Sequence, residues 1–179
     1  MKRIDFGCGG SKKAGFIGVD ILPLPGVDIV HNLTTFPYPF EDNSVDEIWM
    51  DNVLEHLPNP MRVVEELWRI SKNGTKINIA VPYFRSHYAA IDPTHVNFFG
   101  VNWFNYFDPR HTFNKMGYSH AKLNVDGFVF DREWKEKHKG GFLHNQLVRL
   151  ANKRPDFYES KLSHLFPLNS LTFYLTVIK

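Results

Sequence analysis

The sequence has 179 residues, of which 43% are hydrophobic and 22% charged, proportions that are typical of a globular domain and exclude a disordered or fibrous chain. The formal net charge of +2 is too small to indicate nucleic acid as a partner, and the single cysteine, Cys8, excludes both an intrachain disulfide and a zinc site made of cysteines. No apolar run approaches the roughly 18 residues that cross a membrane, and no signal segment is recognisable, so we expect one domain over residues 1–179 in the cytoplasm.

Strands and helices alternate in the first half of the chain. Apolar runs bounded by turn residues predict strands at 3–6, 16–21, 27–32, 45–50 and 76–81. Asn59 and Pro60 predict the start of a helix, because asparagine caps free amides and proline is tolerated at the first helical position. Asn73 and Gly74 predict its end. This alternation predicts an α/β fold with a parallel sheet, whose ligands lie beyond the carboxyl ends of the strands.

The second half is less regular and richer in aromatic residues. A polar connection at 84–102 is longer than most loops of compact domains, which favours a functional role. Helical stretches are predicted at 102–107, 114–117, 143–152 and 155–165, and strands at 121–130 and 170–178. The basic residues Arg132, Lys135, Lys137 and Lys139 alternate with acidic ones, which is more typical of a solvated face than of an anion site.

The strongest chemical signal is a glycine turn followed by an acidic residue. Asp5-Phe6-Gly7-Cys8-Gly9-Gly10 closes the first strand, and Gly18-Val19-Asp20 closes the second. Glycines after a strand allow the backbone to approach a ligand, and a carboxylate can accept two hydrogen bonds from a ribose diol. The dinucleotide fingerprint is not met, because position 12 is lysine instead of glycine and Asp20 follows the turn sooner than the usual spacing of about 20 residues. An NAD-dependent oxidoreductase is therefore disfavoured.

At these residues the sequence resembles the class I S-adenosylmethionine-dependent methyltransferase family, in the group that carries Asp-x-Gly-x-Gly and Leu-Glu-His. The resemblance continues through Asp46-Glu47-Ile48 and Val53-Leu54-Glu55-His56-Leu57, and into the Gly74–Pro82 segment. It implies a Rossmann-like fold with a mostly parallel seven-stranded sheet, the last strand antiparallel, and S-adenosylmethionine as cofactor. One departure is that only five residues separate the glycine turn from the second strand, so the helix after the first strand is missing.

The resemblance also implies which residues hold the cofactor. Gly7 and Gly9 would approach its methionine part, Asp20 its ribose and Ile21 its adenine. Asn32 and Leu33 would lie along the adenine edge, and Asp51 and Asn52 at the methionine end. The full set of implied cofactor residues is Asp5, Gly7, Gly9, Asp20, Ile21, Asn32, Leu33, Asp51 and Asn52. Residues 1–82 would then form the cofactor half and residues 83–179 the half that binds the substrate.

The long connection carries the candidate catalytic residues, His87 and His95. We predict that both lie near the transferable methyl group together with Tyr83, and that the helical region 142–165 helps to cover the pocket. Packing of that region elsewhere, or in a subunit contact of a homodimer, stays open. Glu55 and His56 are expected to stabilise the loop or helix after the fourth strand and not to act directly in catalysis. No histidine pair has the i, i+4 spacing of a helical metal site, so no metal is expected.

Three functions remain open from the sequence. The first is transfer of a methyl group from S-adenosylmethionine to a small molecule, for which the cofactor supplies the reactive group and the protein supplies alignment. The second is a binding or regulatory protein that keeps the cofactor site without turnover. The third and least favoured is the NAD-dependent oxidoreductase.

Overall fold

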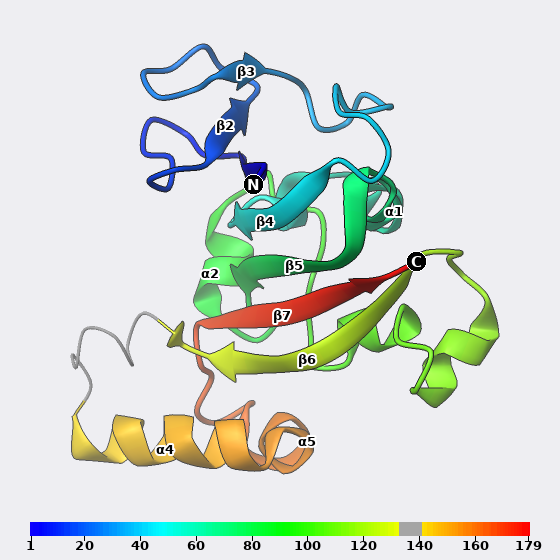
Figure 1. Ribbon diagram of the computed structural model, residues 1–179. Coiled ribbons are helices and arrows are strands. Elements are labelled where there is room, and N and C mark those ends of the chain that lie inside the picture. Colours follow the sequence, from blue (N-terminus) through cyan, green and yellow to red (C-terminus); the bar gives the residue numbers. More distant parts are fainter. Residues whose placement is uncertain (133–140) are drawn as a thin grey trace.

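The computed structural model describes residues 1–132 and 141–179 and contains one seven-stranded sheet, with strand order β3-β2-β1-β4-β5-β7-β6 (Figure 1). Strands β1 to β5 are parallel to one another, and β7 runs antiparallel between β5 and β6. The predicted mixed sheet is therefore confirmed, and Lys135, Lys137 and Lys139 lie outside the described residues. The strands are β1 (Arg3–Phe6), β2 (Ile17–Asp20), β3 (Ile29–Val30), β4 (Val45–Asp51), β5 (Ser71–Pro82), β6 (Lys122–Phe130) and β7 (Ser170–Ile178).

The helices lie mainly in the second half of the chain. No helix separates β1 from β2, as the sequence predicted, and in the described residues none is long and apolar enough to cross a membrane. The helical elements are η1 (Leu54–His56), α1 (Pro60–Ile70), α2 (His87–Ile91), η2 (Trp103–Tyr106), η3 (Thr112–Met116), α4 (Phe142–Lys153), α5 (Pro155–Phe157) and the π-helical η4 (Tyr158–Leu162).

Helix α1 begins as predicted and ends earlier than predicted. The Asn59 side chain accepts a hydrogen bond from the Arg62 amide at 3.1 Å, which caps the first turn. The helix stops at Ile70, because Ser71 already pairs with Val45 at the start of β5. The expected stop at Asn73 and Gly74 is therefore wrong: Gly74, at φ 84°, turns the chain inside an irregular part of β5.

The two faces of the sheet differ in polarity. Residues that are paired across β1, β4, β5 and β7 form rows that run perpendicular to the strands. All side chains of one row point to the same side of the sheet, and the next row points to the opposite side. One row is Ile4, Ile48, Ile77 and Leu175, and all four side chains are buried beneath α1 and the aromatic residues of the second half. The adjacent row on the opposite face is Asp5, Trp49, Asn78 and Tyr174. No helix of the described chain crosses this polar face, which looks toward the reader in Figure 1.

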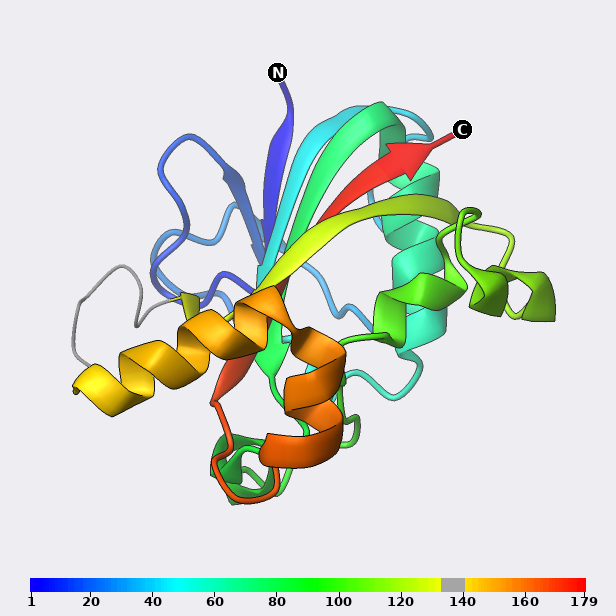
Figure 2. The same cartoon turned by 90° about the horizontal axis from the view of Figure 1, so that it is seen from below.

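Helices α4 and α5 pack beside the ends of β6 and β7 (Figure 2). The Asn152 side chain accepts a hydrogen bond from the Phe130 amide at 2.8 Å, and Val148 and Ala151 are buried toward the strands. The buried Tyr158 hydroxyl donates to the Phe166 carbonyl at 2.9 Å and accepts from the Leu168 amide at 2.7 Å. These bonds hold the helical region against the sheet edge.

Asp108 ties the η2–η3 segment to β6. Its carboxylate accepts hydrogen bonds from the Arg110 guanidinium and from the Val125 amide, the latter at 2.9 Å. Burial alone would raise the pKa of Asp108, but the bonds from Arg110 and the Val125 amide outweigh it and lower the pKa to about 2.

Replacing Asp108 with asparagine should lower the free energy of unfolding by about 2 kcal/mol at pH 7, because a lowered carboxyl pKa stabilises the fold above the unfolded-state pKa. In the wild type this contribution should be lost as the pH falls through about 2. Urea unfolding at pH 7 and pH 3 measures both effects, with the variant's deficit smaller at pH 3. Glu41→Gln, at an exposed position, is the matched control. Equal stabilities of Asp108→Asn and wild type at pH 7 would contradict the account.

Candidate cofactor and acceptor site

The residues predicted to hold a cofactor gather at one edge of the sheet. Strand β1 lies between β2 and β4, and all three are parallel, so their carboxyl ends meet. Gly7 follows β1, Asp20 ends β2 and Asp51 ends β4. This edge is where open α/β sheets bind ligands.

Gly7 and Gly9 have different structural reasons for being glycine. Both have positive φ angles, 67° and 55°. A Cβ on Gly7 would lie 2.2 Å from Cγ2 of Val53, so packing alone requires glycine there. A Cβ on Gly9 would meet nothing within 4 Å. The backbone at Gly9 therefore faces open space, as expected where a ligand approaches closely.

Asp20 joins the glycine turn to the second strand. Its Oδ2 accepts a hydrogen bond from the Gly9 amide at 2.8 Å, and its Oδ1 accepts from the Leu22 amide at 3.0 Å. A carboxylate oxygen has two lone pairs, so each oxygen keeps one for a further donor. Asp5 is placed differently: it is buried, and its Oδ2 accepts from the Lys13 amide at 2.8 Å. Asp5 therefore organises the loop between β1 and β2.

Residues that follow β2 and β3 lie beside Asp20 at the same edge of the sheet, and most of them are apolar. Ile21, Leu22 and Leu24 are exposed by 58%, 54% and 39%, an unusual run of open hydrophobic side chains beside Asp20. Leu33 is buried, and Asn32 Oδ1 accepts hydrogen bonds from both the amide and the hydroxyl of Thr34. Ile21 thus offers an apolar surface to a ring, whereas Asn32 shapes the turn after β3.

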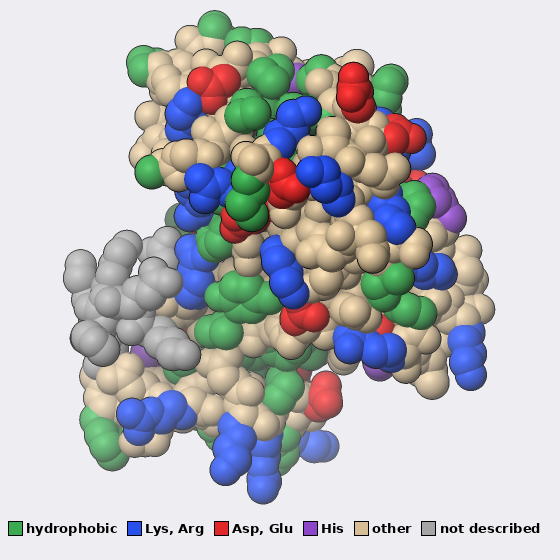
Figure 3. All heavy atoms as spheres, in the orientation of Figure 1, with side chains coloured by type: hydrophobic (Ala, Val, Ile, Leu, Met, Phe, Trp, Pro, Cys, Tyr) green, Lys and Arg blue, Asp and Glu red, His purple; other side chains and the backbone are tan. Residues whose placement is uncertain are grey.

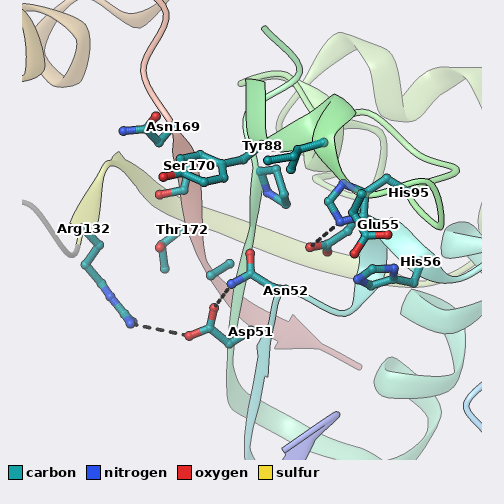
Figure 4. A pocket seen from close by; sticks show the side chains of 14 residues that line it. Asp51, Asn52, Glu55, His56, Tyr88, His95, Arg132, Asn169, Ser170 and Thr172 are labelled. Atoms are coloured by element: carbon teal, nitrogen blue, oxygen red, sulfur yellow. Dashed lines mark hydrogen bonds and ion pairs between the residues drawn. The ribbon is translucent and has the colours of Figure 1, made fainter. Parts of the chain in front are cut away.

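A cavity of about 480 Å³ lies beyond the ends of β4 and β5 (Figure 4). Its wall continues from the edge where the candidate cofactor residues gather, since Asp51 and Asn52 belong to both. Asn52 has a φ of 52°, and its side-chain amide donates to Asp51 Oδ1 at 3.1 Å. An ion pair of 3.8 Å joins Asp51 to Arg132. The cavity is lined by Asp51, Asn52, Glu55, His56, Ala80, Pro82, Tyr88, Ile91, Asp92, His95, Arg132, Asn169, Ser170 and Thr172.

Of the three residues that the sequence placed near the methyl group, His95 alone lines this cavity. His87 is exposed and stacks on Tyr88 with 3.9 Å between ring centroids. Tyr88 is the helical neighbour that lines the cavity, and adjacent residues of a helix point in different directions. Tyr83 is fully buried beside Phe130 and Tyr158, because strand alternation turns it away from the cavity side that Pro82 occupies.

Helices α4 and α5 contribute no residue to the lining. The expectation that region 142–165 covers the pocket is therefore wrong for this cavity. Instead, α2 and the segment that follows it form one wall, while Asn169 and Ser170 at the start of β7 form another. The bonds of Tyr158 and Asn152 explain why α4 and α5 stay beside the strand ends.

Sequence reasoning assigned Glu55 and His56 to loop stabilisation, yet both line the cavity. Glu55 is 1% exposed, and burial raises the pKa of its carboxyl to about 7. The signal was present in the Leu-Glu-His motif. The sequence did not reveal that Glu55 is buried in η1 with its carboxylate beside His95, which lies forty residues later in the connection 84–102.

Comparisons with known proteins agree with this geometry. Residues 22–79 match the family model described as the methyltransferase domain. No curated protein matches the sequence. Among solved structures, an S-adenosylmethionine-dependent methyltransferase from Archaeoglobus fulgidus is 18% identical, with a TM-score of 0.56 over 98% of this chain and 86% of that one. The [4+2]-cyclase SpnF is 14% identical, with a TM-score of 0.58 over 98% and 74% of the two chains.

A third structure bears on ligand binding in this fold. Phosphoethanolamine N-methyltransferase 2 of Haemonchus contortus, in complex with phosphomonomethylethanolamine and S-adenosylhomocysteine, has a TM-score of 0.55. It is 14% identical to this chain, covering 99% of it and 48% of the nematode protein. The sheet order and these neighbours show that the chain has the fold of class I S-adenosylmethionine-dependent methyltransferases, and residues 22–79 also match the methyltransferase domain model.

Proposed function

We propose that this protein transfers the methyl group of S-adenosylmethionine to a small, polar acceptor bound in the 480 Å³ cavity. The observation that carries the proposal is that the cavity shares Asp51 and Asn52 with the cofactor edge. A cofactor held at the glycine turn would therefore present its reactive end to a polar pocket of suitable size. In this arrangement residues 1–82 form the cofactor half, and residues 83–179 complete the acceptor pocket.

The residues present fit the proposed cofactor. The open space at Gly9 leaves room for a close ligand, and Asp20 keeps acceptor capacity for a ribose diol. The exposed Ile21 offers a surface on which adenine can pack. When bound, S-adenosylmethionine supplies an activated methyl group and leaves as S-adenosylhomocysteine. The same residues at the same edge would hold either form.

The chain's own contribution is positioning and charge. Asn52 and Asp51 fix the wall where the two ligands meet, and Arg132 beside Asp51 can bind an anionic or strongly polar group of the acceptor. Alignment of nucleophile and methyl carbon can supply a large part of the rate acceleration in such reactions. A base is required only if the acceptor atom must lose a proton. His95, on the cavity wall, is proposed to act on that proton, and His87 is not.

The fold alone does not choose the reaction, since one structural neighbour is named as a [4+2]-cyclase. Incubation with methyl-labelled S-adenosylmethionine and a panel of small amines, alcohols, carboxylates and phosphorylated alcohols would test the proposal. Formation of a labelled product together with S-adenosylhomocysteine is the expected result. Cofactor binding without turnover on any acceptor would favour the binding or regulatory alternative, and NADH binding would favour the oxidoreductase.

Replacing Asp20 with alanine should weaken S-adenosylmethionine binding by about 1.5–3 kcal/mol, because hydrogen bonds to a charged group are lost. Asp20→Asn should lose less, since its amide oxygen can still accept from the Gly9 amide and hold the turn. Isothermal titration calorimetry with S-adenosylmethionine measures both variants. The exposed Glu41→Gln serves as control. An unchanged dissociation constant in Asp20→Ala would remove Asp20 from the site.

A further inference from the structure

Three potential metal ligands converge on one side of the cavity (Figure 4). Glu55 and His56 come from η1, and His95 comes from the segment after α2. One ligand atom of each residue lies within 4.8 Å of the others. The distance from Glu55 Oε1 to His95 Nε2 is 3.9 Å, and the two imidazole ring centroids are 4.6 Å apart.

The Glu55 carboxylate lacks the partners that a buried charge requires. Its side chain is 2% exposed, and neither oxygen has a hydrogen-bond partner among the described residues. A buried carboxylate without such bonds costs roughly several kcal/mol, and this cost is removed when the group binds a proton or a compensating cation. Glu55 thus points independently to a cationic ligand at this place.

Hydrogen bonds fix how both imidazoles present their nitrogens. The Thr94 hydroxyl donates its only proton to Asp92 Oδ1 at 2.6 Å, so it must accept from His56 Nδ1 at 2.8 Å. His95 Nδ1 lies 3.2 Å from the Ala89 carbonyl oxygen, which can only accept. Both rings therefore carry hydrogen on Nδ1 and leave a lone pair on Nε2. This is the arrangement that outer-sphere partners impose on metal-ligating histidines.

We propose that Glu55, His56 and His95 bind a divalent transition-metal ion, with zinc as the first choice. Imidazole nitrogens suit zinc, iron, cobalt or nickel, whereas magnesium and calcium prefer oxygen ligands alone. Ligand atoms around tetrahedral zinc are about 3.3 Å apart, so small side-chain rotations would close the 3.9 Å gap between Glu55 and His95. The hydrogen bonds from His56 to Thr94 and from Thr94 to Asp92 would hold the His56 ring in the orientation that metal binding requires.

Two histidines and one carboxylate would leave a coordination position open, and all three residues line the cavity. An oxygen or nitrogen atom of the acceptor could bind there. The ion would then lower the pKa of a bound hydroxyl, whose proton passes to solvent, so that His95 would serve as a ligand in place of acting as the base. This role deepens the proposed function and rests on it, whereas metal binding itself does not depend on methyl transfer.

The test uses metal alone, on the full chain after dialysis against a chelator. Zinc binding followed by calorimetry should show one site per chain, and Co²⁺ should give visible absorption bands of a site with nitrogen ligands. His56→Ala, His95→Ala and Glu55→Gln should each weaken Zn²⁺ binding at least tenfold. His164→Ala, at an exposed histidine outside the cavity, is the matched control and should bind as the wild type does.

Thr94→Val separates a metal site from a merely structural cluster. It leaves all three ligands in place and removes the acceptor for His56 Nδ1–H, so Zn²⁺ affinity should fall about 10–100-fold while thermal stability of the metal-free protein changes little. The proposal would be overturned if the wild type bound none of Zn²⁺, Co²⁺, Ni²⁺ and Fe²⁺. It would equally be overturned if a His56→Ala/His95→Ala double variant kept the wild-type affinity. Calorimetry with S-adenosylmethionine on the same samples reports the cofactor site separately.

Discussion

Replacement of Gly7 by alanine is expected to lower the free energy of unfolding by about 2–5 kcal/mol, combining left-handed backbone strain with overpacking. The residue has a φ of 67°, and an added Cβ would lie 2.2 Å from Val53 Cγ2. Val53 precedes η1, so relief of the clash would displace the chain that carries Glu55 and His56. Urea unfolding followed by circular dichroism measures the loss.

The Val53→Ala change provides an internal test of the cause. If the clash with Val53 dominates, the Gly7→Ala/Val53→Ala double variant should be more stable than the sum of the single changes predicts. Gly9→Ala, where φ is 55° and the added atom meets nothing, should lose only about 1–2 kcal/mol of stability. It should nevertheless weaken S-adenosylmethionine binding. Equal stability losses in Gly7→Ala and Gly9→Ala would refute the packing explanation.

The second large effect is expected at Arg69, where Arg69→Met should cost about 3–5 kcal/mol because it leaves a buried carboxylate unpaired. Glu66 is 2% exposed, and its Oε1 accepts from Arg69 Nη2 at 2.6 Å and from the Tyr38 amide at 2.6 Å. The same guanidinium donates to the Tyr38 and Phe40 carbonyls and is bonded to Asp42. Arg69 therefore holds the segment after Leu33 against α1.

A matched pair of variants separates buried charge from lost packing. Glu66→Gln in the Arg69→Met background removes the unpaired charge and should recover part of the lost stability. Arg62→Met, which breaks a 3.5 Å ion pair between the exposed Arg62 and the partly buried Glu65 on the same helix, should change stability by less than about 1 kcal/mol. Chemical denaturation gives all three values. If Arg62→Met and Arg69→Met were equally destabilising, the buried carboxylate would not be the cause.

Local signals predicted the sheet well. Short apolar runs between turn residues located all seven strands, and Asn59 with Pro60 located the start of α1, because each feature depends on residues close together in sequence. The resemblance to methyltransferases then supplied the strand directions, mostly parallel with the last strand antiparallel, which local patterns cannot give. The end of α1 was missed because Ser71 enters the sheet before the glycine is reached, a tertiary effect.

The site was predictable only where it follows directly from strand ends. Gly7, Asp20 and Asp51 lie together because parallel strands end together, and the sequence order revealed this. The His87 side chain points away from the cavity because His87 begins the short helix α2. The loop-like composition of 84–102 did not predict this helix. The cluster of Glu55, His56 and His95 joins segments about forty positions apart, without helical ligand spacing, so neither spacing nor composition could reveal it.

The bare polar face of the sheet has a consequence for how the sequence can vary. On Figure 3, which shows the molecule from this side, basic and acidic side chains mingle over the strands. Since one layer of apolar side chains beneath the sheet provides the packing, alternate positions of each strand carry very different constraints. Substitutions at the buried Ile48, Ile77 and Leu175 must preserve side-chain shape and volume. Asn78 and Tyr174 are partly exposed to solvent, so these positions tolerate a wider range of side chains. Across relatives, we therefore expect substitution rates to alternate along β4, β5 and β7, low at the buried positions and higher at the positions of the polar face.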